Sequence, residues 1–502
     1  MPLGLLKYGL SRTYPVRGDI PQTPELRSSY DVVIVGGGGH GLACAHYLSK
    51  YHGIRNVAVL EKGYLAGGNT ARNTTTIRSN YITPQSIAFY QEGVKLYEEM
   101  SQELDFNVMF SQRGQLTLAH TEASLRSFHL RAEMGKHLGT RIEVVDQKGV
   151  KELSPLLNMD HGGPLEIVGG LWHADGGTAR HDAVAWGYAG QASRRGVQIH
   201  QRTEVEAFEV SNGRVQTIVT NRGRLSCGQV LIAAGGMNYD VALLAGVELP
   251  IRCYPLQAMV TQPLKPWLDT LVSSVSLHTY LVQSARGEIV IGGGSDPYQL
   301  YSTRSTLDMK EHLAAGAVHL FPFLKSVKVL RQWGRHHRHD PGLHADHGRE
   351  PAFQSLARLR LGNLGLQSHS GGGQAHGRNH RHRPRPRYPE AVRTRAFRLV
   401  QSDQRDGRDG SESLMKVLTC PMNGPRNIDE FQSFGPVRTM PDPGAASDAE
   451  WSRYLFRSEN RKGVVVEWWR HVPSNYFFLA ERDIVSNEIL RTFDPAELAP
   501  PS

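Results

Sequence analysis

Hydrophobic and polar positions alternate in short blocks from about residue 30 to residue 333. The continuous apolar run at 32–35 is typical of a strand buried on both faces, and residues 42–50 after it are helix-like. A second apolar run, in the segment NVAVLEKG, predicts a strand that ends at Glu61. Short strands that alternate with helices indicate an α/β domain.

The block pattern ends at Gly334. Residues 335–413 contain 9 of the 23 histidines and no Ile, Met, Trp or Cys, and neither the helical nor the strand period is present. The alternation of apolar and polar blocks resumes at Met415 and includes the segment VVVEWWRHVPSNYFFLAERD. We therefore divide the chain into a polar lead-in, a large α/β part, an irregular segment and a C-terminal module, which span residues 1–29, 30–334, 335–413 and 415–502. The irregular segment buries too little apolar area to offset its ordering entropy, so we expect it to be disordered.

Composition limits the class of protein. The 502 residues suffice for two or three domains, and no apolar run approaches the ~18 residues that a membrane span needs. The first 29 residues lack the apolar core and cleavage site of a secretory signal, and the four cysteines show no tight spacing. We expect a cytoplasmic protein without a membrane segment.

The net charge of +9 is concentrated in one place. Residues 335–413 hold 15 Arg, no Lys and 8 acidic residues, which gives 15 − 8 = +7 and leaves +2 for the rest of the chain. The basic character therefore belongs to the irregular segment, and we expect no nucleic-acid partner for the α/β part.

A glycine-rich turn joins the first predicted strand to the first helix. In YDVVIVGGGGHGLACAHYLSK the glycines fall as Gly36-x-Gly38-x-x-Gly41. Gly36 permits a tight turn, Gly38 lets the backbone approach a pyrophosphate, and Gly41 lets the helix pack on the strand. The helix N-terminus offers unpaired N–H groups to phosphate. Glu61, twenty residues after Gly41, can accept hydrogen bonds from both ribose hydroxyls.

FAD is favoured over NAD as the nucleotide. The segment GGNTARNTTTIRSNY at 67–81 follows the acid directly, where amine-oxidising flavoproteins place a loop that faces the isoalloxazine. The later strand GQVLIAAGG at 228–236 returns under the adenine side. We assign to a non-covalent FAD the residues Gly36, Gly38, Gly39, His40, Gly41, Glu61, Asn69, Thr74, Thr75 and Val205.

Several segments resemble one family in order and spacing, the beta subunit of heterotetrameric sarcosine oxidase. They are YDVVIVGGGGHGLA, NVAVLEKGYLAGGNTARNTTTIRSNY, NVMFSQRGQLTLAH, GGTARHDAVAWGYA and PLQAMV. The resemblance implies a glycine-oxidase-like fold: a Rossmann-like FAD domain, about 30–100 and 170–250, interleaved with a mixed-sheet substrate domain, about 101–169 and 251–334. It also implies oxidative demethylation of sarcosine to glycine, with hydride transfer to FAD, electron transfer to FMN and reduction of O2 to H2O2. Alpha and gamma subunits are the implied partners, with alpha binding NAD and the folate that takes up the methylene.

The resemblance also assigns roles to single residues. His181 in ARHDAV matches the family histidine that is covalently attached to FMN, and a neutral imidazole is a suitable nucleophile for that bond. Arg78 in TIRSNY resembles the arginine that grips the substrate carboxylate, for which a planar two-donor fork is well suited. Tyr81, three residues on, is expected to shape the same pocket.

The irregular segment corresponds to family motifs if its coding DNA is translated in another reading frame. A DNA sequence that encodes Gly-Ile-Ile-Asp-Met-Thr-Pro-Asp in frame encodes the histidine-rich start of residues 336–347 when two bases are skipped. The same offset turns NLGLQSHS at 363–370 into Thr-Trp-Gly-Phe-Lys-Ala-Ile-Pro, the loop whose lysine holds the substrate carboxylate in the family. We interpret 335–413 as a frameshifted beta-subunit tail, so the closing segment of the substrate domain is missing. A His-rich metal tract and an Arg-rich nucleic-acid arm are the alternatives.

The C-terminal module resembles the small delta subunit of the same enzyme, through MKVLTCPMNGPRNIDEF, SDAEWSRYLFR and EWWRHVPSNYFFLAERD. Its fold is expected to be α+β. Zinc-binding members of that family use four ligands, of which Cys420 and His471 remain here, while Asn423 and Asn475 stand at the other two positions. We therefore expect no zinc.

Loss of the lysine loop predicts that this beta–delta fusion oxidises sarcosine poorly. Two other functions fit the same sequence. One is a non-catalytic assembly protein that uses the nucleotide fold as a scaffold. The other is a related N-methyl amine or dimethylglycine dehydrogenase.

Overall fold

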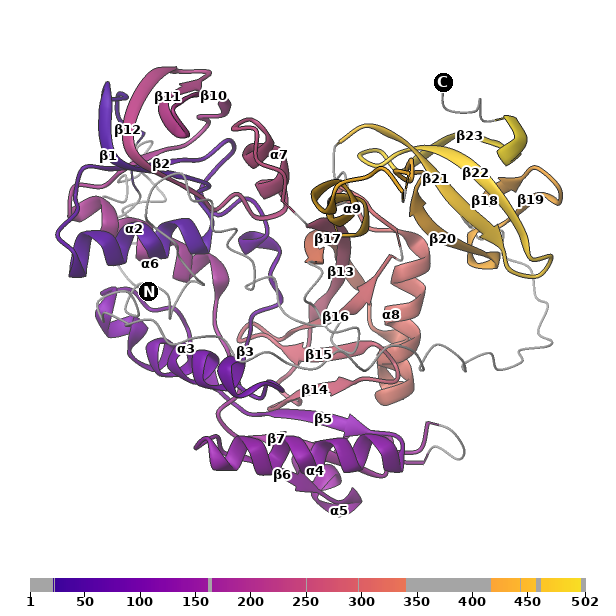
Figure 1. Cartoon of the computed structure of the whole chain (residues 1–502). Helices are drawn as coiled ribbons and strands as arrows, with labels where there is room; N and C mark the ends of the chain where they lie inside the picture. Colours follow the sequence, from indigo (N-terminus) through magenta and orange to yellow (C-terminus); the bar gives the residue numbers. More distant parts are fainter. Residues whose placement is uncertain are drawn as a thin grey trace, which may run out of the picture.

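The computed structural model describes residues 21, 23–160, 165–249, 251–296, 298–339, 417–442, 444–456 and 462–497. These residues form two large sheets with helices on their faces and a strand-rich C-terminal module (Figure 1). Most of the predicted lead-in and residues 340–413 of the predicted irregular segment lie outside the described residues. No helix of the described chain is both long and apolar enough to cross a bilayer.

The nucleotide sheet has six strands in the order β10-β11-β12-β1-β2-β9. Its strands are β1 (Ser29–Val35), β2 (Val57–Leu60), β9 (Gln198–His200), β10 (Val205–Ser211), β11 (Arg214–Thr220) and β12 (Gly223–Ile232). The four strands from β12 to β9 run parallel, and β2 is buried along its whole length. Helices α2 (Gly39–Tyr51) and α6 (His181–Arg194) share one apolar core with β1, β2 and β9. The strand–turn–helix–strand unit predicted from the apolar runs is confirmed.

The second sheet has eight strands in the order β17-β13-β16-β15-β14-β5-β7-β6. Its strands are β5 (Gln115–Ala119), β6 (Ile142–Val145), β7 (Gly169–His173), β13 (Arg252–Pro263), β14 (Leu271–Ser274), β15 (Thr279–Gln283), β16 (Glu288–Ser295) and β17 (Val329–His339). It is mixed, because β14 and β5 pair in parallel while the other neighbours are antiparallel. The chain enters this sheet twice, before and after the later strands of the nucleotide sheet, so the two domains are interleaved as expected.

Helices cover the second sheet and link the domains. Helix α8 packs its buried leucines on the central strands, and α4 packs on β5, β6 and β7. A short third sheet has the order β3 (Thr76–Ile77), β8 (Gly177–Thr178) and β4 (Ser111–Gln112). The remaining elements of this part are α3 (Pro84–Glu103), α4 (Glu122–His137), α5 (Gln147–Leu153), α7 (Asn238–Leu243), α8 (Leu307–Leu320) and the 3-10 turns η1 (Thr70–Arg72), η2 (Gly235–Met237) and η3 (Pro322–Ser326).

Strand β17 continues five residues past the predicted break at Gly334. Its ladder with β13 pairs Arg335 with Leu256 and His339 with Arg252, and both Arg335 and His336 are buried. The expectation of disorder is therefore wrong for 335–339. Ladder hydrogen bonds join backbone groups, so the strand persists where the side-chain pattern that guided the prediction has ended.

The described part of the C-terminal module contains a hairpin, a four-stranded antiparallel sheet and a helix. The hairpin is formed by β18 (Val417–Cys420) and β19 (Gly424–Asn427), and the helix is α9 (Asp448–Phe456). The sheet is formed by β20 (Phe431–Pro436), β21 (Val464–His471), β22 (Tyr476–Asp483) and β23 (Glu488–Phe493), and the 3-10 turns are η6 (Ile428–Glu430) and η7 (Pro495–Glu497). It lies beside β13 and β17 (Figure 1). Tyr298 and Leu300 of the main body belong to its apolar core, together with Trp469 and Phe478. The module therefore shares a core with the segment that follows β16.

Candidate functional site

The glycine turn after β1 has the geometry that its spacing predicted. Gly36 has φ +117°, and a Cβ there would lie 2.4 Å from the carbonyl oxygen of Ala233. A Cβ on Gly41 would lie 2.0 Å from the carbonyl oxygen of Gly36. Both positions exclude any larger residue, since the neighbours are backbone atoms that cannot move aside. The turn therefore brings α2 close to the carboxyl end of β1.

The N-terminus of α2 opens toward a cavity. Its N-cap is Gly38, which has no side chain to satisfy the first N–H groups. The amide of Gly39 donates to the hydroxyl of Thr70 at 2.9 Å. A helix start whose cap residue is a glycine is a favourable place for phosphate, because no side chain of the cap covers it and the positive end of the helix dipole faces the anion.

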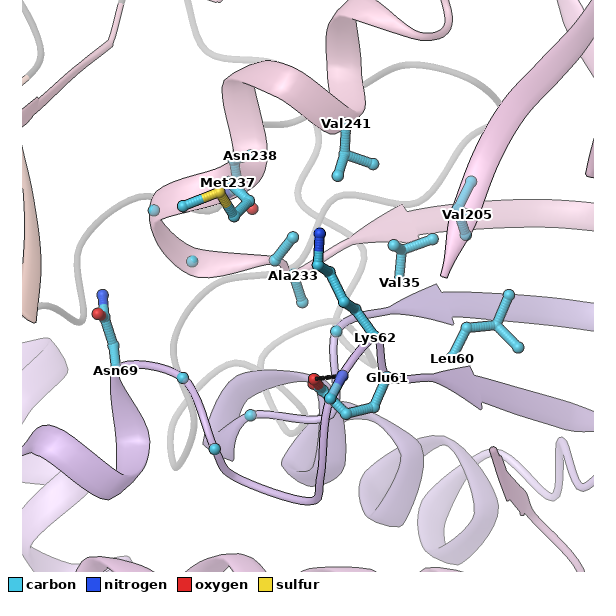
Figure 2. A pocket seen from close by; sticks show the side chains of 18 of the residues that line it. Val35, Leu60, Glu61, Lys62, Asn69, Val205, Ala233, Met237, Asn238 and Val241 are labelled. Atoms are coloured by element: carbon cyan, nitrogen blue, oxygen red, sulfur yellow. Dashed lines mark hydrogen bonds between the residues drawn. The ribbon is translucent and has the colours of Figure 1, made fainter. Parts of the chain in front are cut away.

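The cavity lies at the carboxyl ends of the parallel strands and has a volume of about 770 Å³. Figure 2 shows Asn69 and Val205 on opposite sides of it, with Glu61 and Ala233 between them. Seven of the predicted FAD residues line it: Gly36, Gly38, Gly39, His40, Glu61, Asn69 and Val205. Open α/β sheets bind their ligands at this edge.

Glu61 is held by backbone amides on both carboxylate oxygens. Its Oε2 accepts a hydrogen bond from the amide of Gly37 at 2.8 Å, and its Oε1 accepts one from Gly63 at 2.8 Å. Each carboxylate oxygen has a second lone pair. Fixed in this way at the end of β2, the carboxylate can accept hydroxyl hydrogen bonds from a ligand in the cavity without losing its own position.

Three predicted FAD residues do not line the cavity. Gly41 packs α2 against the turn. The hydroxyl of Thr74 accepts a hydrogen bond from the Tyr280 hydroxyl at 2.7 Å, and Thr75 adopts φ +70°. Thr74 therefore lies where the loop at 67–81 meets the second sheet.

Sequence reasoning missed cavity residues from distant segments. Met237, Asn238 and Asp240 come from η2 and α7, His336 from the end of β17, and Lys462 from the C-terminal module. The apolar strand before η2 was the available signal for the first three. His336 and Lys462 reach the cavity through tertiary packing, for which the sequence carried no local signal.

Arg78 and Tyr81 form one cluster beside the second sheet. The guanidinium of Arg78 lies 4.4 Å from the ring centroid of Tyr81 and donates to Asn80 Oδ1 at 3.0 Å. Tyr81 stacks on Tyr90 with a centroid separation of 3.9 Å. Burial, with a smaller contribution from the charge of Arg78, lowers the pKa of Arg131 to about 10. No carboxylate among the described residues forms an ion pair with Arg78, so its charge can bind an anion.

His181 is the first residue of α6. Burial lowers its pKa, so the imidazole is neutral at pH 7. Its Nδ1 is buried and has no hydrogen-bond partner among the described residues. The neighbouring Asp182 carboxylate is occupied by Arg180, which donates to it from Nε at 2.8 Å and from Nη2 at 2.9 Å. The ring is therefore in its nucleophilic form.

The two predicted remnants of a zinc site lie together in the C-terminal module. Asn423 Nδ2 lies 3.1 Å from Cys420 Sγ, 3.1 Å from His471 Nδ1 and 2.9 Å from Ser474 Oγ. Ser474, not Asn475, completes the group. Among the described residues no three His, Cys, Asp or Glu side chains are grouped as a metal would need. An amide nitrogen lies at the centre of the cluster, and it donates hydrogen bonds where a metal ion would require lone pairs.

Comparisons with known proteins match both parts of the chain. The model of the FAD dependent oxidoreductase family matches residues 31–374, and that of the sarcosine oxidase delta subunit family matches residues 417–495. Sarcosine oxidase subunit beta of Rhodobacter capsulatus is 45% identical over 313 residues, which are 62% of this chain and 75% of that protein. The structure of L-proline dehydrogenase from P. horikoshii superposes on this chain with a TM-score of 0.58 and 27% sequence identity, and the match covers 63% of this chain and 83% of that protein. Glycine oxidase from Geobacillus kaustophilus has the same fold, with a TM-score of 0.57 at 20% identity over 62% of this chain and 83% of its own.

Proposed function

Because the chain belongs to the FAD dependent oxidoreductase family and joins homologues of the beta and delta subunits of sarcosine oxidase, we propose that it oxidises sarcosine. Sarcosine loses a hydride from its N-methyl carbon, and the product is glycine once the methylene has left. The observation that carries this proposal is the cavity at the start of α2, where the cap residue is Gly38.

The residues around the cavity fit FAD. The backbone of the glycine turn and the start of α2 would hold the pyrophosphate, and Glu61 would accept hydrogen bonds from the ribose hydroxyls. Val205, which also lines the cavity, is proposed to contact the adenine. When bound, the flavin supplies a two-electron acceptor for the hydride. The protein supplies the position of that acceptor relative to the substrate.

Arg78 is proposed to hold the substrate carboxylate. Its guanidinium has no described carboxylate partner and is steadied by the ring of Tyr81 and the amide of Asn80. Two parallel N–H donors fix both the position and the orientation of a carboxylate. The N-methyl carbon of a substrate held at one end is thereby kept in a single orientation.

We further propose that His181 is the attachment site of FMN. Support comes from its neutral imidazole and from its buried Nδ1, which has no hydrogen-bond partner among the described residues. Held there, FMN would supply a second electron acceptor after FAD, with oxygen as the final acceptor that is reduced to hydrogen peroxide. Alpha and gamma subunits are the proposed partners, with alpha carrying the folate that accepts the methylene.

The test uses the purified full-length chain. We expect a visible flavin spectrum, bleaching of the flavin band when sarcosine is added without oxygen, and low steady-state turnover. Dimethylglycine and proline in place of sarcosine test the related dehydrogenases. A colourless protein that takes up no FAD would refute the proposal, and a flavin that no amine reduces would favour the assembly protein.

A further inference from the structure

We propose that the C-terminal module contributes Lys462 to the wall of the nucleotide cavity and that this lysine offsets the acidic charge there, so that the anionic cofactor can bind. This inference rests on the proposed function, because it takes FAD as the occupant of the cavity. It makes the delta-like module part of the cofactor site of the beta-like domain.

Lys462 is built into the cavity wall. It lines the cavity together with Asp240 and His336 of the main body. Its Nζ lies 3.7 Å from Asp240 Oδ2 and 5.5 Å from the centroid of the Tyr301 ring. The lysine side chain is 39% exposed, so its ammonium group remains accessible to a ligand in the cavity.

A relay of hydrogen bonds fixes this lysine relative to the nucleotide domain. The carbonyl of Gly463, the next residue, accepts from the amide of Ile484 at 3.0 Å, and the carbonyl of Ile484 accepts from the amide of Tyr301 at 2.7 Å. The Tyr301 carbonyl lies 2.6 Å from His336 Nε2. Ile484 is buried in one cluster with Cys253 and Tyr301. The position of Lys462 therefore depends on main-chain contacts with Ile484 and Tyr301, and through Tyr301 on the side chain of His336 in β17.

The contact between the C-terminal module and the main body is buried beside these hydrogen bonds. Arg482, two residues before Ile484, pairs with Glu467 at 2.7 Å and donates to the carbonyl of Gln299 at 2.7 Å. Arg482 is 0% exposed. The ion pair lies within the C-terminal module, and its arginine also donates to the backbone of the main body, so this buried hydrogen bond joins the two parts at one point and would be lost if they separated.

Acidic side chains line the cavity, and a nearby cation reduces their repulsion of an anionic cofactor. Glu61, Glu204, Glu206 and Asp240 line a cavity whose proposed occupant carries two phosphates. Burial raises the pKa of Asp240, and the charge of Lys462 opposes that rise. The other cavity lysine, Lys62, is already paired with Glu204 at 2.6 Å. Lys462 therefore offsets the charge of Asp240, which would otherwise repel the cofactor.

The experiment measures FAD affinity of the apoprotein of the full chain by fluorescence titration at low salt. We expect Lys462→Met to weaken binding about 5-fold and Lys462→Glu about 25-fold, with both effects reduced at high salt. Asp240→Asn combined with Lys462→Met should return to within about twofold of the unmodified chain, because the charge that Lys462 offsets is gone. Lys148→Met on α5 makes the same charge change on an element of the other sheet and should have no effect.

The outcomes separate the two proposals. FAD affinity equal to that of the unmodified chain in both Lys462 variants would overturn the role of Lys462 and leave the oxidoreductase proposal standing. An unmodified chain that binds no FAD would overturn both. Circular dichroism of each variant shows whether it is folded. If Lys462→Glu is unfolded, the comparison of Lys462→Met with its Asp240→Asn double variant decides.

Discussion

The side chain of Asn69 forms two hydrogen bonds with the backbone of His336. Asn69 Nδ2 donates to the carbonyl of His336 at 2.7 Å, and the amide of His336 donates to Asn69 Oδ1 at 3.0 Å. The pair joins the loop at 67–81 to the edge strand of the second sheet, and both residues line the nucleotide cavity. Nearby, the indole nitrogen of Trp333 donates to the carbonyl of Arg72 at 3.0 Å.

Replacing Asn69 should loosen this junction. Asn69→Ala leaves the two backbone groups of His336 without their partner, which is expected to lower the free energy of unfolding by about 1–3 kcal/mol. FAD affinity should fall with it. Urea denaturation and FAD titration measure the two effects. Asn69→Asp keeps the acceptor and loses the donor, so an intermediate loss is expected; no loss in either variant would contradict the role of the pair.

Arg335 is a buried cation without a counterion. It is 4% exposed, no described carboxylate pairs with it, and burial lowers its pKa. Its Nη1 has no hydrogen-bond partner among the described residues. Arg335→Met is therefore expected to raise the free energy of unfolding by about 1–3 kcal/mol.

The matched control is Arg331→Met, at an exposed position of the same strand. It should change the stability by less than about 0.5 kcal/mol. Urea denaturation compares the two. Destabilisation by Arg335→Met would mean that Arg335 has a partner that stabilises it.

Arg78 should govern substrate affinity and not cofactor affinity. Arg78→Lys keeps the charge and loses the planar fork, so kcat/KM for sarcosine is expected to fall about 10- to 100-fold while FAD remains bound. Arg126→Met, at an exposed position of α4, serves as the control and should leave kcat/KM unchanged. Equal kcat/KM in Arg78→Lys and the unmodified chain would remove Arg78 from the substrate site.

Stability should fall in acid, and His173 should account for part of the fall. This residue is fully buried, and its pKa is lowered to about 4 chiefly by burial. Its Nε2 accepts a hydrogen bond from the amide of Ser79 at 3.2 Å, which requires a neutral ring. The unfolded chain binds a proton at the ordinary pKa of 6.5, so the stability is full above pH 6.5 and declines, by up to about 3 kcal/mol, as the pH falls toward 4.

The variant His173→Asn should flatten this decline. The exposed His129 offers the control, since His129→Asn should retain the slope of the unmodified chain. Denaturation at a series of pH values between 7.5 and 4.5 measures the slopes. The same slope in all three proteins would show that another group causes the acid sensitivity.

The cluster around Asn423 predicts metal content. The unmodified chain should be purified without stoichiometric zinc, because an amide nitrogen is the central group of the cluster. Asn423→Cys combined with Ser474→Cys restores four ligands with Cys420 and His471, and this variant should bind one zinc per chain. Metal analysis after dialysis tests both statements. Stoichiometric zinc in the unmodified chain would contradict the first.

Local rules made much of the nucleotide domain predictable. The apolar run at 32–35, the glycine spacing and the position of Glu61 each depend on a few neighbouring residues, and the structure has the corresponding strand, turn and cavity edge. The roles of Arg78, Tyr81 and His181 stay predictions that the variants above can test. The frameshift within the irregular segment also stays a prediction, to be checked in the DNA that encodes residues 330–340.

Residues placed by tertiary packing could not be predicted in this way. His336 follows Trp333, the last apolar side chain of β17, by three residues and stands between Arg335 and His337. Lys462 precedes β21 in a module that the sequence described as separate. Both reach the cavity through backbone contacts that leave no periodic pattern in the amino acids.

The edge position of β17 has a consequence for how this gene can change. Main-chain pairing with β13 maintains the edge of the sheet at 335–339 without an alternating pattern of apolar side chains. A coding sequence can thus be altered abruptly at this edge while the scaffold behind it survives. The altered C-terminal sequence is then open to natural selection.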